Sequence, residues 1–232
     1  MKSTTKTKEI EKSLGITFKD KSLLDLAFVH KSYVNEANDK SEQNERLEYL
    51  GDAVLELAVT DYLYHKFPGH PEGDLTNWRS ALVKGKNLSK VAKKLGLGEF
   101  LYLSRGEELS GGREKAYILA NTVEAVIGAI YLDSGFEVAR EFIMKHIVVL
   151  LEDIISQGLD VDPKSRVQEL AQEKLNVTPR YELLSETGPD HDKKFVMGIY
   201  FADRLIADGE GSSKQEAEQS AAGNALAKQG WN

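Results

Sequence analysis

Three carboxylates in one short run are the residues of this chain best suited to chemistry. Glu45, Glu48 and Asp52 are spaced i, i+3 and i+7. On a helix that turns by about 100° per residue, they lie within about 60° of one another. Like charges beside apolar residues repel and cost stability when partly buried, so a compensating group is expected. Oxygen ligands at this spacing suit a hard divalent cation such as Mg²⁺ or Mn²⁺. The competing interpretation is an ordinary solvated helix face.

A second polar pair interrupts an apolar helix further along the chain. Asn121 and Glu124 are i, i+3 within the apolar run 118–132. A lone buried glutamate is rarely stable unless it is paired or coordinated. Gly51 and Gly128 would let the two helices pack closely. The packed helices would surround metal ions with Glu48, Asp52, Asn121 and Glu124. A core salt bridge from Glu124 to a lysine or arginine explains the same residues equally well.

The composition describes an ordinary globular protein of one large domain or two small ones. Its 232 residues are 41% hydrophobic and 29% charged. The net charge of −7 argues mildly against a nucleic-acid partner but does not exclude a local basic patch. The absence of cysteine excludes disulfides, thiolate zinc sites and a cysteine nucleophile. The five histidines form no HExxH motif, and no glutamate is followed three residues later by histidine.

The chain carries no targeting signal that we recognise. The basic, polar start from Met1 to Lys8 leads into no apolar h-region, so it is not a secretory signal, and we expect a frayed terminus there. No segment approaches the roughly 18 to 20 apolar residues needed to span a bilayer. These patterns predict a cytoplasmic protein without a membrane partner.

Hydrophobic periodicity divides the chain into an all-α part and a smaller α+β part. Turn signals occupy 67–74 and 109–112. Helices are expected over 21–30, 45–65, 87–95, 116–134 and 138–155. We predict domains at 1–157 and 164–232, joined by a linker at 158–163. The second domain should follow the order α-β-β-β-α, with helices at 164–175 and 213–228 and strands at 180–185, 194–202 and 204–209.

At this point the motifs resemble those of a known family. The run from Asn44 to Leu55 is similar to the signature of bacterial ribonuclease III, and Glu72-Gly73-Asp74, Gly111-Gly112-Arg113 and 118–125 match further family blocks in the right order. The αβββα unit resembles a double-stranded RNA-binding domain. The resemblance covers nearly the whole chain. It implies a homodimeric, Mg²⁺-dependent endoribonuclease without an organic cofactor, which processes ribosomal and other structured RNA precursors.

The resemblance also assigns roles to residues. It places Glu48, Asp52, Asn121 and Glu124 at the metal-binding catalytic positions. Glu45 and Glu72 take the positions of further acidic residues in the cleavage valley. Tyr49 stands where the family has an aromatic side chain that enters a socket on the partner subunit, with ordinary core packing as the alternative. Metal-assisted attack of water on both strands would leave 5′-phosphates, 3′-hydroxyls and a short 3′ overhang.

One position departs from the family pattern. The family usually has Asp where this chain has Asn121. An amide oxygen can ligate Mg²⁺, but it brings no charge and cannot act as a base. The alternative function is therefore a double-stranded RNA-binding protein with weak or no cleavage. A weaker alternative is a structural helical dimer whose carboxylates form surface salt bridges.

The second domain offers three pieces for holding RNA, which is recognised by its shape, its 2′-hydroxyls and its phosphates. Gln168 and Gln172 are i, i+4 on the first helix, although paired glutamines are usually surface residues. Pro189 and His191 lie in a loop. At the second helix, Ser213 and Glu216 form a capping box, and the free amides with Lys214 make an anion site. The family commonly has two adjacent lysines here, whereas Gln215 follows Lys214. In the first domain, Arg113 and Lys115 either meet the RNA backbone or belong to a solvated loop.

Overall fold

The protein is represented by a computed structural model that describes residues 2–37, 42–156, 162–189 and 193–231. The chain forms two compact units, Met1–Asp160 and Val161–Asn232. Four of the six residues of the predicted linker, 158–161, lie outside the described residues. Asp162 caps the helix that follows, by accepting a hydrogen bond from the Lys164 amide, and Pro163 is the first residue of that helix.

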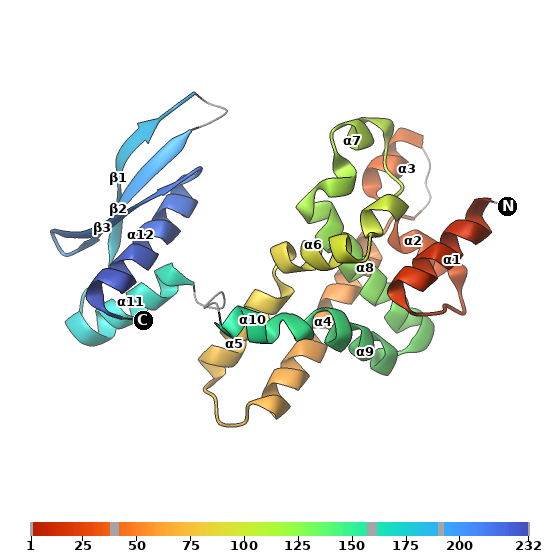
Figure 1. The fold of residues 1–232 in the computed structure, drawn as a ribbon, viewed down its shortest axis with the longest axis horizontal. Helices are drawn as coiled ribbons and strands as arrows, with labels where there is room; N and C mark the ends of the chain where they lie inside the picture. Colours follow the sequence, from red (N-terminus) through yellow and green to blue (C-terminus); the bar gives the residue numbers. More distant parts are fainter. Residues whose placement is uncertain (1, 38–41, 157–161, 190–192, 232) are drawn as a thin grey trace. The chain divides into compact units, whose positions relative to one another are not determined.

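The first unit is helical, as the periodicity predicted (Figure 1). One isolated parallel bridge joins Val29 to Tyr102. The α-helices are α1 Lys2–Leu14, α2 Lys21–Ala27, α3 Lys31–Ala37, α4 Glu45–Lys66, α5 Glu72–Val83, α6 Gly85–Lys94, α7 Arg105–Leu109, α8 Ala116–Ser134, α9 Phe136–His146 and α10 Leu151–Ser156. Short 3-10 turns lie at η1 Leu97–Phe100, η2 Gly112–Glu114 and η3 Val148–Leu150.

Helix α8 is the central helix of this unit. It is apolar around most of its circumference, and its side chains from Ile118 to Ile130 are buried apart from Asn121 and Glu124, which are half-buried. By length and composition alone, α8 could cross a membrane. The sequence-based statement that no segment approaches such a span is therefore wrong for α8. Most of the helix is buried inside the domain, as is usual for a core helix.

Helices α4 and α8 cross at two glycines, as the sequence predicted. A Cβ atom on Gly51 would lie 1.7 Å from the carbonyl oxygen of Glu124. A Cβ atom on Gly128 would lie 2.2 Å from the carbonyl oxygen of Leu47. Backbone therefore touches backbone at the crossing, and only glycine leaves room for it. This contact brings the carboxylates of α4 beside the polar pair of α8.

Three local predictions were wrong. The single helix expected over 138–155 is divided into α9, η3 and α10, and the break falls on the β-branched run Ile147–Val149, whose side chains crowd a helix. Helix α5 begins inside the turn expected at 67–74, because Pro71 sets an extended N-cap. The frayed start expected at Met1–Lys8 is helical from Lys2 onward, as the first turns of α1, whose later residues Ile10 and Leu14 are buried in the core.

The second unit is an α+β domain with the predicted order. Strands β1 Arg180–Thr187, β2 Lys194–Phe201 and β3 Arg204–Gly211 form an antiparallel sheet in the order β1-β2-β3. Helices α11 Pro163–Leu175 and α12 Lys214–Gln229 pack together, and α12 lies against β2 and β3. The core includes Ile199 and the alanine stripe at 221 and 225. A Cβ atom on Gly209 would lie 2.1 Å from the amide nitrogen of Ala221, so the helix rests directly on the strand.

Candidate active site

The crossing of α4 and α8 places Glu48 next to Asn121. The Asn121 side-chain amide donates a hydrogen bond to Glu48 Oε1 at 2.8 Å. Both side chains are half-buried, as is Glu124, whereas Asp52 is exposed. The structure therefore brings together the two halves of the site that the sequence placed on separate helices.

The carboxylates of this cluster act on one another electrostatically. Burial raises the pKa of Glu124 to about 7, and the neighbouring charges of Asp52 and Glu48 add to this effect. Burial also raises the pKa of Glu48, and the charges of Glu45 and Asp52 act in the same direction. The hydrogen bond from Asn121 and the charge of Lys31 partly oppose that rise. Within the described ranges, the groups that act on Glu124 are the carboxylates of Asp52 and Glu48 and no lysine or arginine, so the alternative of a core salt bridge is not present there.

The donor chemistry fits a hard divalent cation, because the carboxylates of Glu48, Asp52 and Glu124 act on one another and the Asn121 side chain lies against Glu48. The side chains are further apart than the ligands of a complete metal site. Among the residues that the structure describes, no group of three or more His, Asp or Glu side chains is already arranged to hold a metal ion. Mutual repulsion between the carboxylates and the bond between Asn121 and Glu48 are consistent with this open arrangement.

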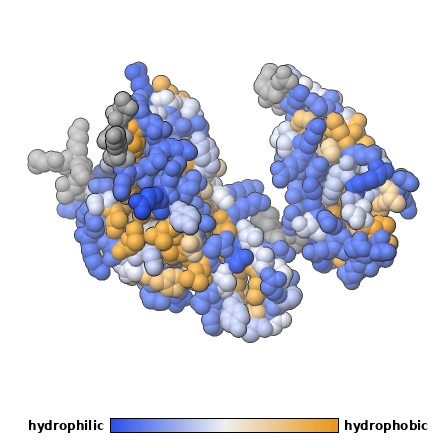
Figure 2. Space-filling model, turned by 180° about the vertical axis from the view of Figure 1, so that it is seen from behind, coloured by the Kyte–Doolittle hydropathy of each residue, from blue (hydrophilic) through white to orange (hydrophobic). Residues whose placement is uncertain are grey.

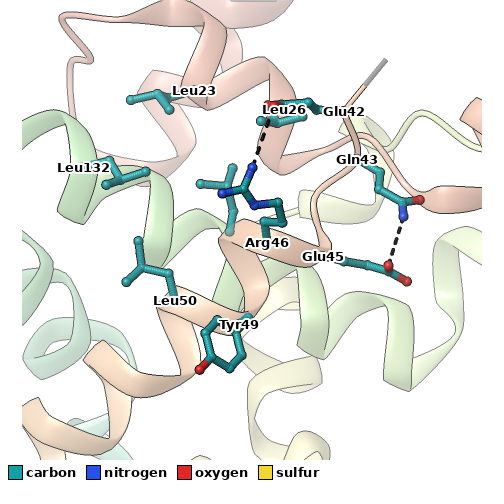
Figure 3. A pocket seen from close by; sticks show the side chains of 10 residues that line it. Leu23, Leu26, Glu42, Gln43, Glu45, Arg46, Tyr49, Leu50 and Leu132 are labelled. Atoms are coloured by element: carbon teal, nitrogen blue, oxygen red, sulfur yellow. Dashed lines mark hydrogen bonds and ion pairs between the residues drawn. The ribbon is translucent and has the colours of Figure 1, made fainter. Parts of the chain in front are cut away.

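Glu45 and Tyr49 lie on the exposed part of α4. Glu45 forms an ion pair with Lys31 at 3.3 Å and accepts a hydrogen bond from the Gln43 side chain at 2.9 Å. Tyr49 is 82% exposed, so ordinary core packing does not explain it. It lines a pocket (Figure 3), whose apolar walls are formed by Leu23, Leu26, Leu47, Leu50 and Leu132.

Glu72 is not joined to this cluster by any contact that the structure describes. It is the first residue of α5, it is exposed, and its carboxylate accepts a hydrogen bond from the Thr76 hydroxyl at 2.8 Å. Its role in the cleavage valley stays a prediction.

Arg113 and Lys115 are engaged in internal contacts, which argues against a role in RNA binding. The Arg113 guanidinium donates hydrogen bonds to the carbonyls of Gly98, Glu99 and Leu101. It also pairs with Glu108 at 2.8 Å, so it ties the loop around α7 to η1. Lys115 pairs with Glu107 at 2.6 Å, and hydrogen bonding to that carboxylate raises the Lys115 pKa.

The second unit presents most of the predicted RNA contacts on its surface. Gln168 and Gln172 are exposed on α11, and Gln172 donates a hydrogen bond to the Asn176 side chain at 2.8 Å. Pro189 is exposed, whereas His191 lies outside the described residues. Lys214 is exposed at the first position of α12.

The predicted capping box at the start of α12 is half right. The Ser213 hydroxyl accepts a hydrogen bond from the Glu216 amide at 3.2 Å, as expected. The Glu216 carboxylate does not reach back to the Ser213 amide. It accepts instead from the amide and hydroxyl of Ser212, one residue earlier. The helix start therefore carries an acidic side chain beside its free amides, which weakens it as an anion site.

Sequence analysis missed two residues that set the geometry of the site. Asn44 is buried, its side-chain amide donates to the Ala27 carbonyl at 3.1 Å, and its backbone amide donates to Val29. These bonds fix the start of α4. Its position just before the helix was the available signal. Lys31 is the second, and its distance from Glu45 in the sequence gave no local signal.

The fold and the site define a class: a helical nuclease domain with an acidic site, followed by a double-stranded RNA-binding domain. Family models agree, since residues 20–151 match "Ribonuclease-III-like" and residues 163–229 match "Double-stranded RNA binding motif". "Ribonuclease 3" of Dehalococcoides mccartyi strain 195 is 48% identical over 94% of this chain and 92% of its own length. "Ribonuclease 3" of Bdellovibrio bacteriovorus is 44% identical over 94% of each. The solved nuclease domain of ribonuclease III from Campylobacter jejuni is 50% identical, with a TM-score of 0.56 over 60% of this chain and 94% of that one.

The chain belongs to the ribonuclease III family. It is an endoribonuclease that acts on double-stranded RNA, and the prediction of an enzyme is confirmed. The alternative of a binding protein without cleavage is not favoured. The family is generally dependent on divalent metal ions.

Proposed function

We propose that Glu48, Asp52, Asn121 and Glu124 bind Mg²⁺, or Mn²⁺ in its place, and that Glu45 and Glu72 assist at the edge of the cleavage valley. The single observation that supports this most is the crossing at Gly51 and Gly128, because it sets these side chains against one another. Residues 1–157 would form the catalytic domain and 164–232 the RNA-binding domain. The enzyme would act in the cytoplasm on precursors of ribosomal and other structured RNA.

The chain's own groups determine how the reaction is set up. A bound Mg²⁺ would supply acidity to an attacking water and offset charge on the scissile phosphate. Glu48 and Asp52 are both positioned by helix α4. The Asn121 amide restrains the Glu48 carboxylate through its hydrogen bond. Glu124 must lose its proton to act as a ligand, and burial raises its pKa to about 7. The products would carry 5′-phosphates and 3′-hydroxyls with a short 3′ overhang.

The enzyme would work as a homodimer whose two sites cut opposite strands. The exposed Tyr49 stands at the rim of a pocket that is walled by leucines. In a two-fold dimer the same patch faces itself, so the partner's Tyr49 would enter this pocket. Apolar residues on the displayed surface of the larger unit are visible as orange patches (Figure 2). Exposed Leu57 and Tyr64 on the same helix extend the apolar character of α4.

The second domain would hold the RNA by shape. Gln168 and Gln172 would contact one minor groove, and Pro189 with His191 a second. Ser213 and Lys214 would contact the phosphates between them. The recognition of duplex form would then belong to the second domain.

The test is to incubate the full chain with long double-stranded RNA in Mg²⁺, in Mn²⁺ and in chelator. We expect the RNA to be shortened only when metal is present. We expect Glu124→Gln to lower the cleavage rate by at least about 10²-fold, because a metal ligand is lost. A Glu124→Gln variant that cleaves at the wild-type rate in Mg²⁺ would contradict the proposed site.

A further inference from the structure

Lys31 lies at the edge of the carboxylate cluster. It is the first residue of α3, and its Nζ is 3.3 Å from Glu45 Oε1. The two side chains are 58% and 47% exposed, so both can be reached from solvent. Glu45 precedes Glu48 by three residues on α4, and one helical turn therefore separates this ion pair from the proposed site.

Among the described residues, Lys31 is the one lysine or arginine that is paired with an acidic residue at the edge of the proposed site, Glu45. Arg113 and Lys115 are committed to other partners, as shown above. RNA that approaches a cluster of carboxylates meets like charge. A cation at the edge of such a cluster offsets that repulsion and offers a phosphate a partner.

The pair between Lys31 and Glu45 can be exchanged at small cost. An exposed ion pair contributes about 0 to 1 kcal/mol. Glu45 also accepts a hydrogen bond from the Gln43 side chain, through its other carboxylate oxygen. It therefore keeps a partner when Lys31 leaves.

We propose that Lys31 contacts a backbone phosphate of the double-stranded RNA beside the cleavage site, and that it exchanges Glu45 for this phosphate when RNA binds. The proposal rests on the placement of the active site given above. Lys31 binds substrate and takes no part in bond cleavage.

The first experiment compares Lys31→Gln with the matched control Lys93→Gln, in steady-state cleavage of a defined RNA duplex in Mg²⁺. Lys93 pairs with Glu114 at the same 3.3 Å and is 53% exposed, but it lies on α6. For Lys31→Gln we expect KM to rise by about 3- to 10-fold, the slope of log KM against log salt to fall by about one, and kcat to stay within about twofold. The control should change none of these. An unchanged KM and slope, or a loss of kcat alone, overturns the proposal.

The second experiment tests the exchange itself through Glu45→Gln and the double variant. Removing the competing carboxylate should lower KM by about 2- to 5-fold, whatever happens to kcat. In the Lys31→Gln background the same change should have no effect on KM. An equal fall of KM in both backgrounds would show a general charge effect and overturn the exchange. The proposed metal site is tested separately by Glu124→Gln, whose loss of cleavage does not depend on Lys31.

Discussion

The side-chain amide of Asn121 donates a hydrogen bond to Glu48 Oε1 at 2.8 Å, across the crossing of α4 and α8. Most ribonuclease III sequences are expected to have a carboxylate at this position, which would repel Glu48. Here the neutral amide stabilises it instead. The Asn121 amide brings no charge to the site, and its hydrogen bond orients the Glu48 carboxylate.

We predict that Asn121→Asp lowers the stability of the metal-free protein and raises its affinity for Mg²⁺. A carboxylate facing Glu48 replaces an attraction by a repulsion, so the free energy of unfolding in chelator should fall by about 1 to 2 kcal/mol. A fourth charged oxygen ligand should strengthen Mg²⁺ binding by at least about tenfold. Thermal unfolding at increasing Mg²⁺ measures both effects. In Asn121→Ala the stability should fall without any gain in Mg²⁺ affinity, and equal Mg²⁺ affinity in all three proteins would contradict the prediction.

Glu124 makes the stability of the metal-free protein depend on pH. Its pKa is about 7 in the folded state, against an ordinary value of 4.5, so the folded state binds more protons between these values. Stability contributed by the protonated group is present at low pH and is lost as pH rises through about 7. We expect Glu124→Gln to be more stable than the wild type by about 1 to 2 kcal/mol at pH 8 in chelator, after allowance for solvent screening. Urea unfolding at pH 5 and pH 8 measures this difference. If the variant loses stability at pH 8, the burial argument is wrong.

The close crossing of α4 and α8 at Gly51 predicts that two glycine-to-alanine substitutions in the first unit have different effects on the free energy of unfolding. Gly51→Ala would set a Cβ atom 1.7 Å from a backbone carbonyl oxygen, and the helices must separate to accept it. We expect a loss of more than about 2 kcal/mol in the free energy of unfolding. Gly73→Ala, on α5, meets nothing within 4 Å and should be neutral or slightly stabilising. Denaturant titration of both variants checks this, and equal stabilities would mean that the crossing is looser than described.

Much of the site could be predicted because it depends on spacing along single helices. The periodicity of α4 and α8 placed Glu48, Asp52, Asn121 and Glu124 on their faces, and small residues marked where the helices meet. The pair between Lys31 and Glu45 could not be predicted, since it joins two separate helices, α3 and α4, whose placement against each other depends on tertiary contacts. The break near Ile147 was missed because apolar spacing continues through it, while the β-branched crowding that ends the helix is a weaker signal.

Tyr49→Ala should dissociate the proposed homodimer. The side chain is 82% exposed in one chain, and a buried aromatic anchor at an interface contributes several kcal/mol to binding. We expect the dimer dissociation constant to rise by at least about 10²-fold, which corresponds to about 2.7 kcal/mol. Sedimentation over a range of concentrations measures it. Leu109→Ala removes a side chain of similar exposure, 80%, from α7 and should leave the dimer intact. Dissociation in both variants, or in neither, would reject Tyr49 as the anchor.

Lys214 should contribute to RNA affinity and not to cleavage chemistry. It is exposed at the start of α12, where free backbone amides favour a phosphate, although the Glu216 carboxylate bound to Ser212 reduces that attraction. For Lys214→Ala we therefore expect a modest rise in KM for double-stranded RNA, about 3- to 10-fold, with a salt slope smaller by about one and an unchanged kcat. Glu216→Gln should move KM in the opposite direction, because it removes the competing charge. Steady-state cleavage at several salt concentrations separates these effects, with Lys174→Ala on α11 as a control for the loss of one positive charge. An equal rise of KM in Lys174→Ala would show that only net charge matters, and that the start of α12 is not a phosphate contact.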